Sequence, residues 1–366
     1  MNSYMEEPLE IVLAAPEGNY EVTVDIKAHE DTSFCIFAQH RSFAARDEYI
    51  KSGETRSFTF VVNVCGRNFY GDKYRDAEGI KIQVVCDGSV TATAAASPVE
   101  VPTVYICGDS TVTDQPAEYP YIPSETFCGW GQAFPMLTRN TVAVSNHAQS
   151  GSCTAEFMEA NLKAFEDKIK PGDFMVIEFG HNDQKKPELS AEGGYSKNVG
   201  ALIDLAKAKG AVPIVCSPIN RIIFEPDGHL KNLLGGYRNA AKETAERGGA
   251  AFIDMWSMTT DYMETAGPVK SWQFFRCKGE ERDYTHTNDI GGTLIAKMFA
   301  SAMTECDGPL SAHIDEARIG FERVISDPGD SADNSDIIAH SKSIGLVNVP
   351  DDLDADITGL QIGGKK

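Results

Sequence analysis

The sequence predicts an α/β protein in which a small β-sandwich precedes a larger domain with a parallel sheet and helices on both of its faces. Two observations support this prediction. Polar and apolar residues alternate with period two through residues 1–100, and apolar strand-like runs alternate with helical patterns through residues 101–306. The first pattern is typical of half-buried strands, and the second is typical of parallel sheets covered by helices. A chain of 366 residues is long enough for two domains.

Short strands separated by turns account for the first domain, residues 1–100, in which no segment has a convincing helical pattern. The strands are expected at residues 20–26, 34–38, 55–64, 80–86 and 90–94. Asp87-Gly88 separates the last two strands, and an Asp-Gly pair at such a place is a strong hairpin signal. Several short strands with regular turns predict a small β-sandwich.

Strands and helices follow each other in the second domain, residues 101–306. Strands are expected at residues 103–107, 141–145, 174–179, 211–216 and 250–254, and helices at residues 129–138, 154–169, 195–209, 232–248 and 290–304. In open sheets of this kind, ligands bind beyond the carboxyl ends of the strands. The acidic residues 307–366 are expected to form a C-terminal extension that is docked only in part.

The formal net charge of −21 excludes some classes of partner. Nucleic acids and anionic membranes would repel such a surface, so we expect no nucleic-acid partner and no membrane partner. No stretch approaches the roughly 20 apolar residues that a membrane span needs. The first ten residues carry acidic side chains where a secretory signal would carry basic ones. This predicts a cytoplasmic protein, or a secreted one if a leader was removed.

The nine cysteines are scattered along the chain, without Cys-x-x-Cys pairs or histidines at zinc spacing. Four of them, Cys65, Cys86, Cys107 and Cys216, lie in apolar strand-like runs, where a reduced cysteine packs as a small hydrophobic residue. The sequence therefore predicts buried free thiols in a reducing compartment.

Four polar clusters in the second domain carry the functional signal. They are Gly108-Asp109-Ser110-Thr111, the stretch 146–152 (N-H-A-Q-S-G-S), the stretch 179–183 (F-G-H-N-D) and the stretch 283–288 (D-Y-T-H-T-N). Taken singly, each is ordinary loop or turn sequence, and an isolated Asp-x-x-His is a weak motif. Three of the clusters follow strands of the same predicted sheet, and all four are expected in loops. Their side chains can therefore meet at the carboxyl edge of that sheet.

In this order, the four clusters resemble the blocks of the SGNH (GDSL-type) hydrolases, and within them those of the rhamnogalacturonan acetylesterase-like carbohydrate esterases. Further similarity comes from Gly129-Trp130-Gly131-Gln132, Lys170-Pro171-Gly172-Asp173 and Ser217-Pro218, and the resemblance covers residues 102–305. It implies a flavodoxin-like three-layer α/β/α SGNH hydrolase domain. The serine lies in no G-x-S-x-G elbow, the motif of the α/β-hydrolases.

Carried over position by position, the resemblance implies a Ser-His-Asp triad and an oxyanion hole. Ser110 matches the nucleophile, His286 the general base and Asp283 the carboxylate that orients it. The N–H groups of Ser110 and Gly151 and the side-chain amide of Asn182 match the oxyanion-hole donors. Ser150-Gly151-Ser152-Cys153 stands where the commonest form of the family has Gly-Gly-Arg-Ser. The donor glycine is kept, so the missing arginine bears on a pectin-type substrate more than on catalysis.

These residue types suit acyl transfer. A serine hydroxyl becomes a good nucleophile when a hydrogen-bonded imidazole accepts its proton, and a buried aspartate fixes the tautomer of that imidazole. Donors in the oxyanion hole stabilise the charge that develops on the acetyl carbonyl oxygen. Water then releases the acetyl group from the serine in the same way, and we expect no metal and no cofactor.

Other polar and aromatic residues of the second domain have more than one interpretation. His181 and Asp183 are expected to shape the loop around Asn182, and His147 is expected to be structural, with a substrate contact as its alternative. Trp130, Tyr195, Arg221 and Trp272 are candidates for the lining of a sugar-binding cleft, although both tryptophans could equally belong to the core.

The resemblance favours a serine carbohydrate esterase that removes O-acetyl groups from acetylated plant cell-wall oligosaccharides derived from pectin, rhamnogalacturonan or xylan. Two alternatives stay open: an SGNH lipase- or thioesterase-like hydrolase, and a non-catalytic carbohydrate-binding protein on an esterase scaffold. The sequence also leaves open whether the chain forms a homo-oligomer and what the β-sandwich does.

Overall fold

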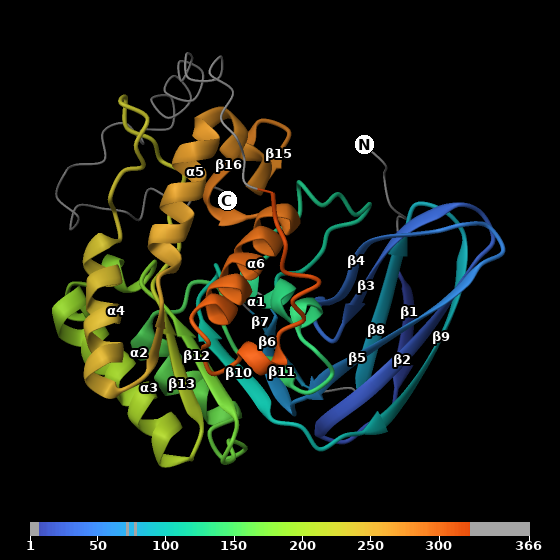
Figure 1. Cartoon of the computed structure of the whole chain (residues 1–366), viewed down its shortest axis with the longest axis horizontal. Helices are drawn as coiled ribbons and strands as arrows, with labels where there is room; N and C mark the ends of the chain where they lie inside the picture. Colours follow the sequence, from blue (N-terminus) through green and yellow to red (C-terminus); the bar gives the residue numbers. More distant parts are fainter. Residues whose placement is uncertain (1–6, 71–72, 77–78, 323–366) are drawn as a thin grey trace.

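The computed structural model describes residues 7–70, 73–76 and 79–322 (Figure 1). Residues 323–366, most of the predicted acidic extension, lie outside the described residues.

The first part of the chain is a β-sandwich, as predicted. One sheet has the strand order β1-β8-β3-β4 and the other the order β5-β2-β9, with antiparallel pairing throughout. The strands are β1 (Leu9–Leu13), β2 (Gly18–Ala28), β3 (Thr32–Ala38), β4 (Ser42–Ile50), β5 (Thr55–Val64), β8 (Ile80–Cys86) and β9 (Val90–Pro98), and β6 (Arg67–Tyr70) and β7 (Lys73–Asp76) form a separate ribbon.

Apolar side chains on alternate residues hold the two sheets of the sandwich together. Val22, Val24 and Ile26 of β2 are fully buried in the same core as Ile82 and Val84 of β8. Successive residues of a strand face opposite sides of the sheet, so the polar residues between those of β2 lie on the outer face. The period-two pattern of the sequence follows from this packing.

The second part of the chain is a three-layer α/β/α body, which confirms the predicted fold class. Its five parallel strands are ordered β11-β10-β12-β13-β14. Counted along the chain, this order is 2-1-3-4-5, the flavodoxin-like arrangement. The strands are β10 (Thr103–Gly108), β11 (Ala143–Asn146), β12 (Phe174–Glu178), β13 (Val212–Cys216) and β14 (Ala251–Ile253). The helices are α1 (Trp130–Ala133), α2 (Thr154–Ala160), α3 (Ser196–Ala208), α4 (Gly235–Gly248), α5 (Met255–Ser271) and α6 (Asp289–Glu305).

Helices cover both faces of the parallel sheet. Figure 1 shows α2, α3 and α4 on one side, and α1 and α6 on the other side, between the sheet and the sandwich. Side chains of β10 alternate between the two cores: Tyr105 and Cys107 join the core that contains α3, and Val104 and Ile106 join the core that contains α6. Burial on both faces explains why this strand is a continuous apolar run.

Two predicted helices are shorter than expected. The helix expected at residues 129–138 is divided into α1 and a 3₁₀ turn at Phe134–Leu137. Pro135 lies at the start of that turn. It has no backbone N–H, so it cannot form the hydrogen bond to the preceding helical turn that would continue α1. The helix expected at residues 154–169 ends at Ala160 and is followed by a 3₁₀ turn at Leu162–Ala164.

One helix and two strands of the second part, α5, β15 and β16, were not predicted. Gly267, at a φ of +74°, and Pro268 interrupt the helical pattern of α5. The strands β15 (Phe275–Lys278) and β16 (Glu281–Thr287) form an antiparallel hairpin. The expectation that Asp283 and His286 lie in a loop is therefore wrong, because both lie on β16. The polar sequence E-R-D-Y-T-H-T lacks the apolar alternation by which a half-buried strand is recognised.

The sandwich and the α/β body share one apolar core. Both faces of β3 are buried: Phe34 and Ile36 belong to the core of the sandwich, whereas Cys35 and Phe37 belong to the same core as Phe299 of α6. A strand that is buried on both faces lies inside the molecule, so β3 anchors the sandwich on the α/β body.

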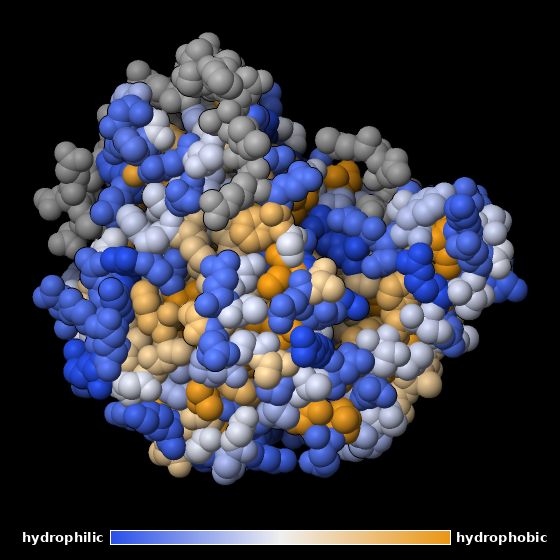
Figure 2. Space-filling model, viewed as in Figure 1, coloured by the Kyte–Doolittle hydropathy of each residue, from blue (hydrophilic) through white to orange (hydrophobic). Residues whose placement is uncertain are grey.

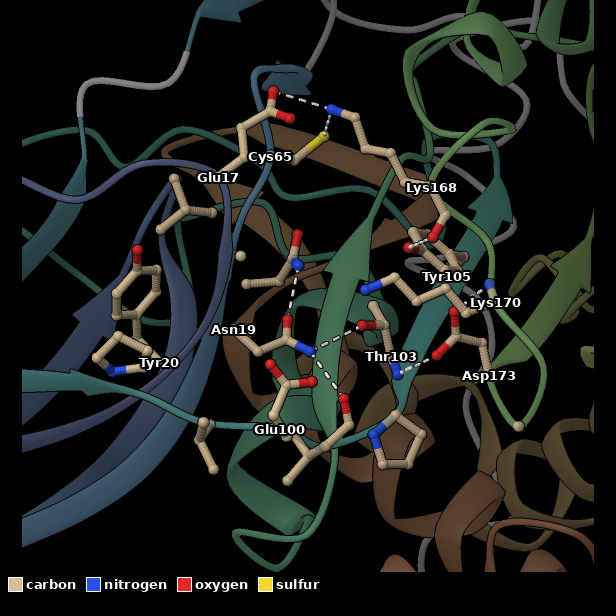
Figure 3. A pocket seen from close by; sticks show the side chains of 18 of the residues that line it. Glu17, Asn19, Tyr20, Cys65, Glu100, Thr103, Tyr105, Lys168, Lys170 and Asp173 are labelled. Carbon is tan, nitrogen blue, oxygen red and sulfur yellow. Dashed lines mark hydrogen bonds and ion pairs between the residues drawn. The ribbon is translucent and has the colours of Figure 1, made fainter.

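A cavity of about 720 Å³ lies between the sandwich and the amino ends of β10 and β12 (Figure 3). Asn19 bridges the two parts there, because its amide donates to the backbone carbonyl of Val101 at 2.9 Å and to the hydroxyl of Thr103 at 3.0 Å. Asp173, just before β12, accepts a bond from the backbone N–H of Thr103 at 2.8 Å. This junction lies at the edge of the parallel sheet opposite to the carboxyl ends of its strands.

All nine cysteines are free; Cys86, Cys107 and Cys216 are buried, and Cys65 is half-buried. The prediction of free thiols is confirmed, and that of burial holds for three of the four cysteines named. Hydrophilic residues cover much of the face shown in Figure 2, with smaller hydrophobic areas between them. Within the described ranges, no helix has the length and apolar character that crossing a membrane requires.

Phe299 packs against α1 from α6. Its ring is fully buried, and its centroid lies 4.8 Å from that of Trp130 and 5.2 Å from that of Phe134. We expect Phe299→Ala to lower the free energy of unfolding by about 3–5 kcal/mol, because it removes buried apolar surface and leaves a cavity. Urea unfolding followed by tryptophan fluorescence measures this change, since all three tryptophans lie in the α/β body.

The matched control for Phe299→Ala is Val269→Ala. Val269 is 58% exposed. Its truncation is expected to change the free energy of unfolding by less than about 0.5 kcal/mol. Equal effects of the two substitutions would contradict the assignment of Phe299 to the core.

Candidate active site

The structure brings all four polar clusters together at the carboxyl edge of the parallel sheet. Ser110 follows β10, the stretch 146–152 follows β11, and the stretch 179–183 follows β12. β10 is paired with β11 on one side and with β12 on the other, so these three clusters are neighbours. β10 precedes both of its neighbours in the chain, so the strand order runs outward from it in two directions. Open α/β sheets bind ligands at such a switch point.

Ser110, His286 and Asp283 form a hydrogen-bonded chain. The hydroxyl of Ser110 lies 2.7 Å from Nε2 of His286, and Nδ1 of His286 lies 2.9 Å from Oδ2 of Asp283. The other carboxylate oxygen of Asp283 accepts bonds from the backbone N–H groups of Thr285 and His286, each at 2.8 Å. The side chain of His286 is 29% exposed and that of Asp283 is 11% exposed. The imidazole is thus open to a substrate on one side and held by a carboxylate on the other.

The surroundings of Asp283 keep its carboxyl group ionised. Burial alone would raise its pKa, but attraction to His286 and the hydrogen bonds from His286 and Thr285 outweigh burial and lower the pKa below its ordinary value. With a carboxylate at Nδ1, a neutral imidazole carries its proton there. Nε2 is then free to accept the proton of the Ser110 hydroxyl.

The other two predicted site residues, Gly151 and Asn182, lie in the segments that follow β11 and β12, the two strands paired with β10. Gly151 stands in the turn after β11 at a φ of +81°, a backbone conformation that glycine adopts readily. The amide nitrogen of Asn182 donates to the backbone carbonyl of Ser152 at 3.0 Å. This nitrogen carries two hydrogens, and the contact with Ser152 uses one of them. Asn182 is therefore fixed against the turn that contains Gly151.

Gln115 ties this turn to Ser110. Its side-chain amide donates to the backbone carbonyl of Ser110 at 3.0 Å and to the hydroxyl of Ser150 at 3.1 Å. One buried side chain thus connects the segments that carry Ser110 and Gly151. Sequence reasoning missed Gln115, because a glutamine in a loop has no local pattern that marks it.

Lys185 is a second residue that sequence reasoning missed. Its ammonium group donates to Oδ1 of Asn182 at 2.9 Å. Burial lowers the pKa of Lys185 to about 8, and repulsion from Arg221 acts in the same direction. The ammonium group holds Oδ1 of the amide and so orients Nδ2 away from itself. The only signal in the sequence is the spacing of three residues between Asn182 and Lys185, which puts the two side chains on one side of a 3₁₀ turn.

A pair of buried carboxyl groups lies behind Ser110. Glu178, at the end of β12, accepts bonds from the indole N–H of Trp130 and from the backbone N–H of Ile219 at 3.3 Å, and its Oε1 lies 3.3 Å from the hydroxyl oxygen of Thr111. Asp109 accepts bonds from the backbone N–H of Thr111 at 3.0 Å and from its hydroxyl at 2.9 Å. Burial raises the pKa of Glu178 to about 8, and repulsion from Asp109 adds to this shift.

The neighbouring candidates are mostly structural. Asp183 accepts bonds from the backbone N–H and the hydroxyl of Thr154 at 3.1 and 2.5 Å, so it binds the first turn of α2 next to the site. The ring of His147 stacks on Phe165 with the centroids 4.1 Å apart, and burial lowers the pKa of His147 to about 3. His147 is therefore a neutral core residue.

The candidates for a sugar-binding cleft are mostly buried. Trp130 and Tyr195 are fully buried in the two cores of the α/β body, and Arg221 is 3% exposed. Arg221 donates to the hydroxyl of Thr285, between Asp283 and His286, so it supports the site from within. Only Trp272 is partly buried. The interpretation of Trp130, Tyr195 and Arg221 as cleft-lining residues is wrong.

The structured part of the chain (7–70, 73–76, 79–322) contains no group of three or more His, Cys, Asp or Glu side chains that could hold a metal ion.

Comparisons with known proteins show a family match that spans all four clusters. The GDSL-like Lipase/Acylhydrolase family matches residues 106–291. The chain is 33% identical over 232 residues to "Rhamnogalacturonan acetylesterase RhgT" of Bacillus subtilis (strain 168), which is 60% of this chain and 97% of that protein. It is 30% identical over 220 residues to "Probable rhamnogalacturonan acetylesterase YesY" of the same bacterium, which is 59% of this chain and 98% of that protein.

A solved structure extends the likeness beyond the matched segment. The crystal structure of protein YxiM from Bacillus subtilis has a TM-score of 0.53 and 24% sequence identity, and the match covers 82% of this chain and 80% of that chain. At this identity, the likeness concerns the fold alone.

The carboxyl group of Glu178 makes stability depend on pH. Its pKa of about 8 in the folded protein exceeds the ordinary value of 4.5, so between these values the folded protein binds a proton that the unfolded chain has lost. The free energy of unfolding therefore falls as pH rises through this range, by up to about 1.4 kcal/mol per pH unit for this one group. Glu178→Gln removes the titrating group, so its free energy of unfolding should fall less between pH 5 and pH 8. Urea unfolding at several pH values measures the two slopes, and identical slopes would contradict the raised pKa.

Proposed function

This chain belongs to the GDSL-like lipase/acylhydrolase family and, within it, to the rhamnogalacturonan acetylesterase-like SGNH proteins, and on that basis we propose that it is a serine carbohydrate esterase. Its proposed reaction is the removal of O-acetyl groups from acetylated plant cell-wall oligosaccharides derived from pectin, rhamnogalacturonan or xylan. The observation that carries the proposal is the hydrogen-bonded chain from Ser110 through His286 to Asp283, with distances of 2.7 and 2.9 Å. The printed names of the two relatives support acetylated saccharides as the substrate class.

In the first half of the proposed reaction, Ser110 takes the acetyl group. Its hydroxyl oxygen attacks the acetyl carbonyl while Nε2 of His286 accepts the proton. Asp283, ionised beside Nδ1, stabilises the imidazolium that forms. His286 then gives the proton to the departing sugar oxygen, and the C–O bond to the sugar breaks. The products are a free sugar hydroxyl and an acetyl ester on Ser110.

In the second half, water repeats the sequence on the acetyl-enzyme. His286 accepts a proton from the water as its oxygen attacks the acetyl carbon, and then returns that proton to the oxygen of Ser110. Acetate leaves and the serine hydroxyl is restored. Each half passes through a tetrahedral intermediate with a negatively charged oxygen.

Three donors are proposed to stabilise that oxygen: the backbone N–H groups of Ser110 and Gly151, and the second amide hydrogen of Asn182. Removal of one such donor typically lowers turnover about 10²–10³-fold. The ammonium group of Lys185 binds the opposite end of the Asn182 amide. It withdraws electron density from the amide, so it strengthens Nδ2–H as a donor as well as orienting it.

The first test replaces the proposed nucleophile. We expect Ser110→Ala to abolish the release of acetate from p-nitrophenyl acetate and from acetylated rhamnogalacturonan or xylan oligomers, because it removes the hydroxyl that is hydrogen-bonded to His286 and would carry the acetyl ester. Acetate is measured by a coupled assay, and esters of longer acyl chains are compared in parallel. Ser311→Ala, far from the site in a 3₁₀ turn at Ser311–His313, is the matched control and should keep full activity.

Each other outcome of this test has a distinct meaning. Equal acetate release by Ser110→Ala and the unchanged chain would refute the role of Ser110. A preference for long acyl chains would favour a lipase- or thioesterase-like hydrolase. Binding of acetylated oligomers without any acetate release would favour a carbohydrate-binding protein.

The second test follows pH. The ammonium form of Lys185 predominates below its pKa of about 8 and is lost as pH rises through that value. We therefore expect kcat to fall above about pH 8. Lys185→Arg keeps the positive charge and should shift this fall to higher pH. Lys185→Met should lower kcat at pH 7 about tenfold, a smaller loss than removal of an oxyanion donor itself, and should lack the alkaline fall.

The matched control for this second test is Lys186→Met. The side chain of Lys186 pairs with Glu156 instead of Asn182. Its removal should leave the pH profile of kcat as in the unchanged chain. An alkaline fall in Lys185→Met like that of the unchanged chain would exclude Lys185 as its source.

A further inference from the structure

The turn between β3 and β4 of the sandwich has an unusual conformation. Gln39 and Arg41 in this turn have φ angles of +56° and +79°. Hairpin turns with positive φ normally use glycine, asparagine or aspartate, because a larger side chain is disfavoured there. Arg41 nevertheless occupies this position, and its side chain is 0% exposed. Neither the turn nor the core of the sandwich requires an arginine here, and the hydrogen-bond partners of its side chain lie in the α/β body.

The guanidinium group of Arg41 binds two segments that adjoin His286, one at Asp289 and the other at Phe127. Its Nη1 and Nη2 atoms donate to the carboxylate of Asp289 at 3.0 to 3.2 Å, and the side chain of Asp289 is also 0% exposed. Asp289 is the first residue of α6, three residues after His286. Nη2 donates in addition to the backbone carbonyl of Phe127 at 2.5 Å. The ring of Phe127 meets the ring of His286 edge to face, with the centroids 5.7 Å apart.

The same guanidinium group reaches the Ser110 segment. Nε of Arg41 donates to the backbone carbonyl of Gln115 at 2.8 Å. The side-chain amide of Gln115 holds the backbone carbonyl of Ser110 and the hydroxyl of Ser150, next to Gly151. The amide of Gln132 reinforces this link, since it donates to the backbone carbonyls of Arg41 at 2.9 Å and Gln115 at 3.2 Å.

We propose that Arg41 is a positioning residue that sets the placement of Ser110 relative to His286, and that the β-sandwich is for this reason a working part of the active site. The inference rests on the proposed function. An arginine suits this task, because its planar fork donates several bonds at fixed angles at once. Burial of both partners makes the pair rigid, since neither charge can exchange its partner for water without a large loss of stability. The turn between β3 and β4, with Gln39 and Arg41 at positive φ, places the guanidinium group of Arg41 among residues of the α/β body.

The test uses the full chain and a pair of substitutions that removes both buried charges. Arg41→Met alone would leave the carboxylate of Asp289 buried without its cation, which is strongly destabilising. The double variant Arg41→Met/Asp289→Asn avoids this penalty. Arg41→Lys is the conservative variant, which keeps the charge and loses the fork. Asn19→Ala is the matched control, because Asn19 joins the sandwich to the start of β10 at the opposite edge of the sheet (Figure 3).

Three quantities are measured for each variant: the midpoint of thermal unfolding, kcat and KM for p-nitrophenyl acetate, and the rate at which a fluorophosphonate modifies Ser110. We expect kcat of the double variant to fall about 10- to 100-fold at temperatures where it is folded, as displacements of about 1 Å in a catalytic group do. KM should change little, and fluorophosphonate modification should slow by a similar factor. Arg41→Lys should recover part of the loss in kcat, and Asn19→Ala should keep kcat even where its midpoint is lowered.

The outcomes separate this inference from the proposed function. A folded double variant with unchanged kcat would overturn the positioning role, and so would Asn19→Ala with an equal loss of kcat, because any loosening of the sandwich would then suffice. If the double variant is unfolded, Arg41→Lys decides: unchanged kcat and an unchanged modification rate would overturn the inference. An unchanged chain that neither releases acetate nor reacts with the fluorophosphonate would refute the proposed function itself.

Discussion

The proposed active site depends on one constraint: Ser110 follows one strand, His286 lies on another, and these two strands are not paired with each other. β10, which ends just before Ser110, pairs with β11 and β12, whereas β16, which carries His286, pairs with β15. The 2.7 Å contact between the two side chains therefore needs support from outside both sheets. Phe127 forms a β-bridge with Asn288, and the amide of Asn288 donates to the backbone carbonyls of Gln273 and Phe275 at 2.9 and 3.0 Å. These contacts hold the end of β16, and Arg41 connects them to the Ser110 segment.

Burial raises the pKa of an acid and lowers the pKa values of two bases around the site, and both shifts have one cause. Removal from water disfavours the charged form of either sign. It raises the pKa of Glu178 to about 8, and it lowers the pKa of Lys185 to about 8 and that of Arg221 to about 10. Asp283 differs, because the adjacent imidazole and two backbone N–H groups compensate its carboxylate for the lost water. The carboxyl group of Asp283 beside the imidazole thus stays charged, whereas burial favours the neutral form of Glu178 behind Ser110.

The parts of the fold that the sequence predicted correctly are those in which one local pattern decides one element. β2 and β10 are examples, because burial on one face or on both faces leaves a direct trace in the order of apolar residues. α5 was missed because Gly267 and Pro268 interrupt its pattern. β16 was missed because its polar residues belong to a two-stranded hairpin, which has no large apolar face to reveal it. In both elements the periodic order of apolar residues is interrupted or absent, so no local pattern marks them.

The amino-acid sequence by itself determined the alternation of strands and helices, and with it the sheet edge at which the segments of Ser110, Gly151 and Asn182 follow neighbouring strands. Asp283 and His286 could be assigned to the same site because their clusters occur in a recognisable order along the chain. Arg41, Gln115 and Lys185 could not be assigned in this way. Arg41 meets Gln115 across 74 positions of the sequence and Asp289 across 248 positions. Only the tertiary structure decided these contacts, because no local pattern records which distant side chain a buried charge will meet once the chain has folded.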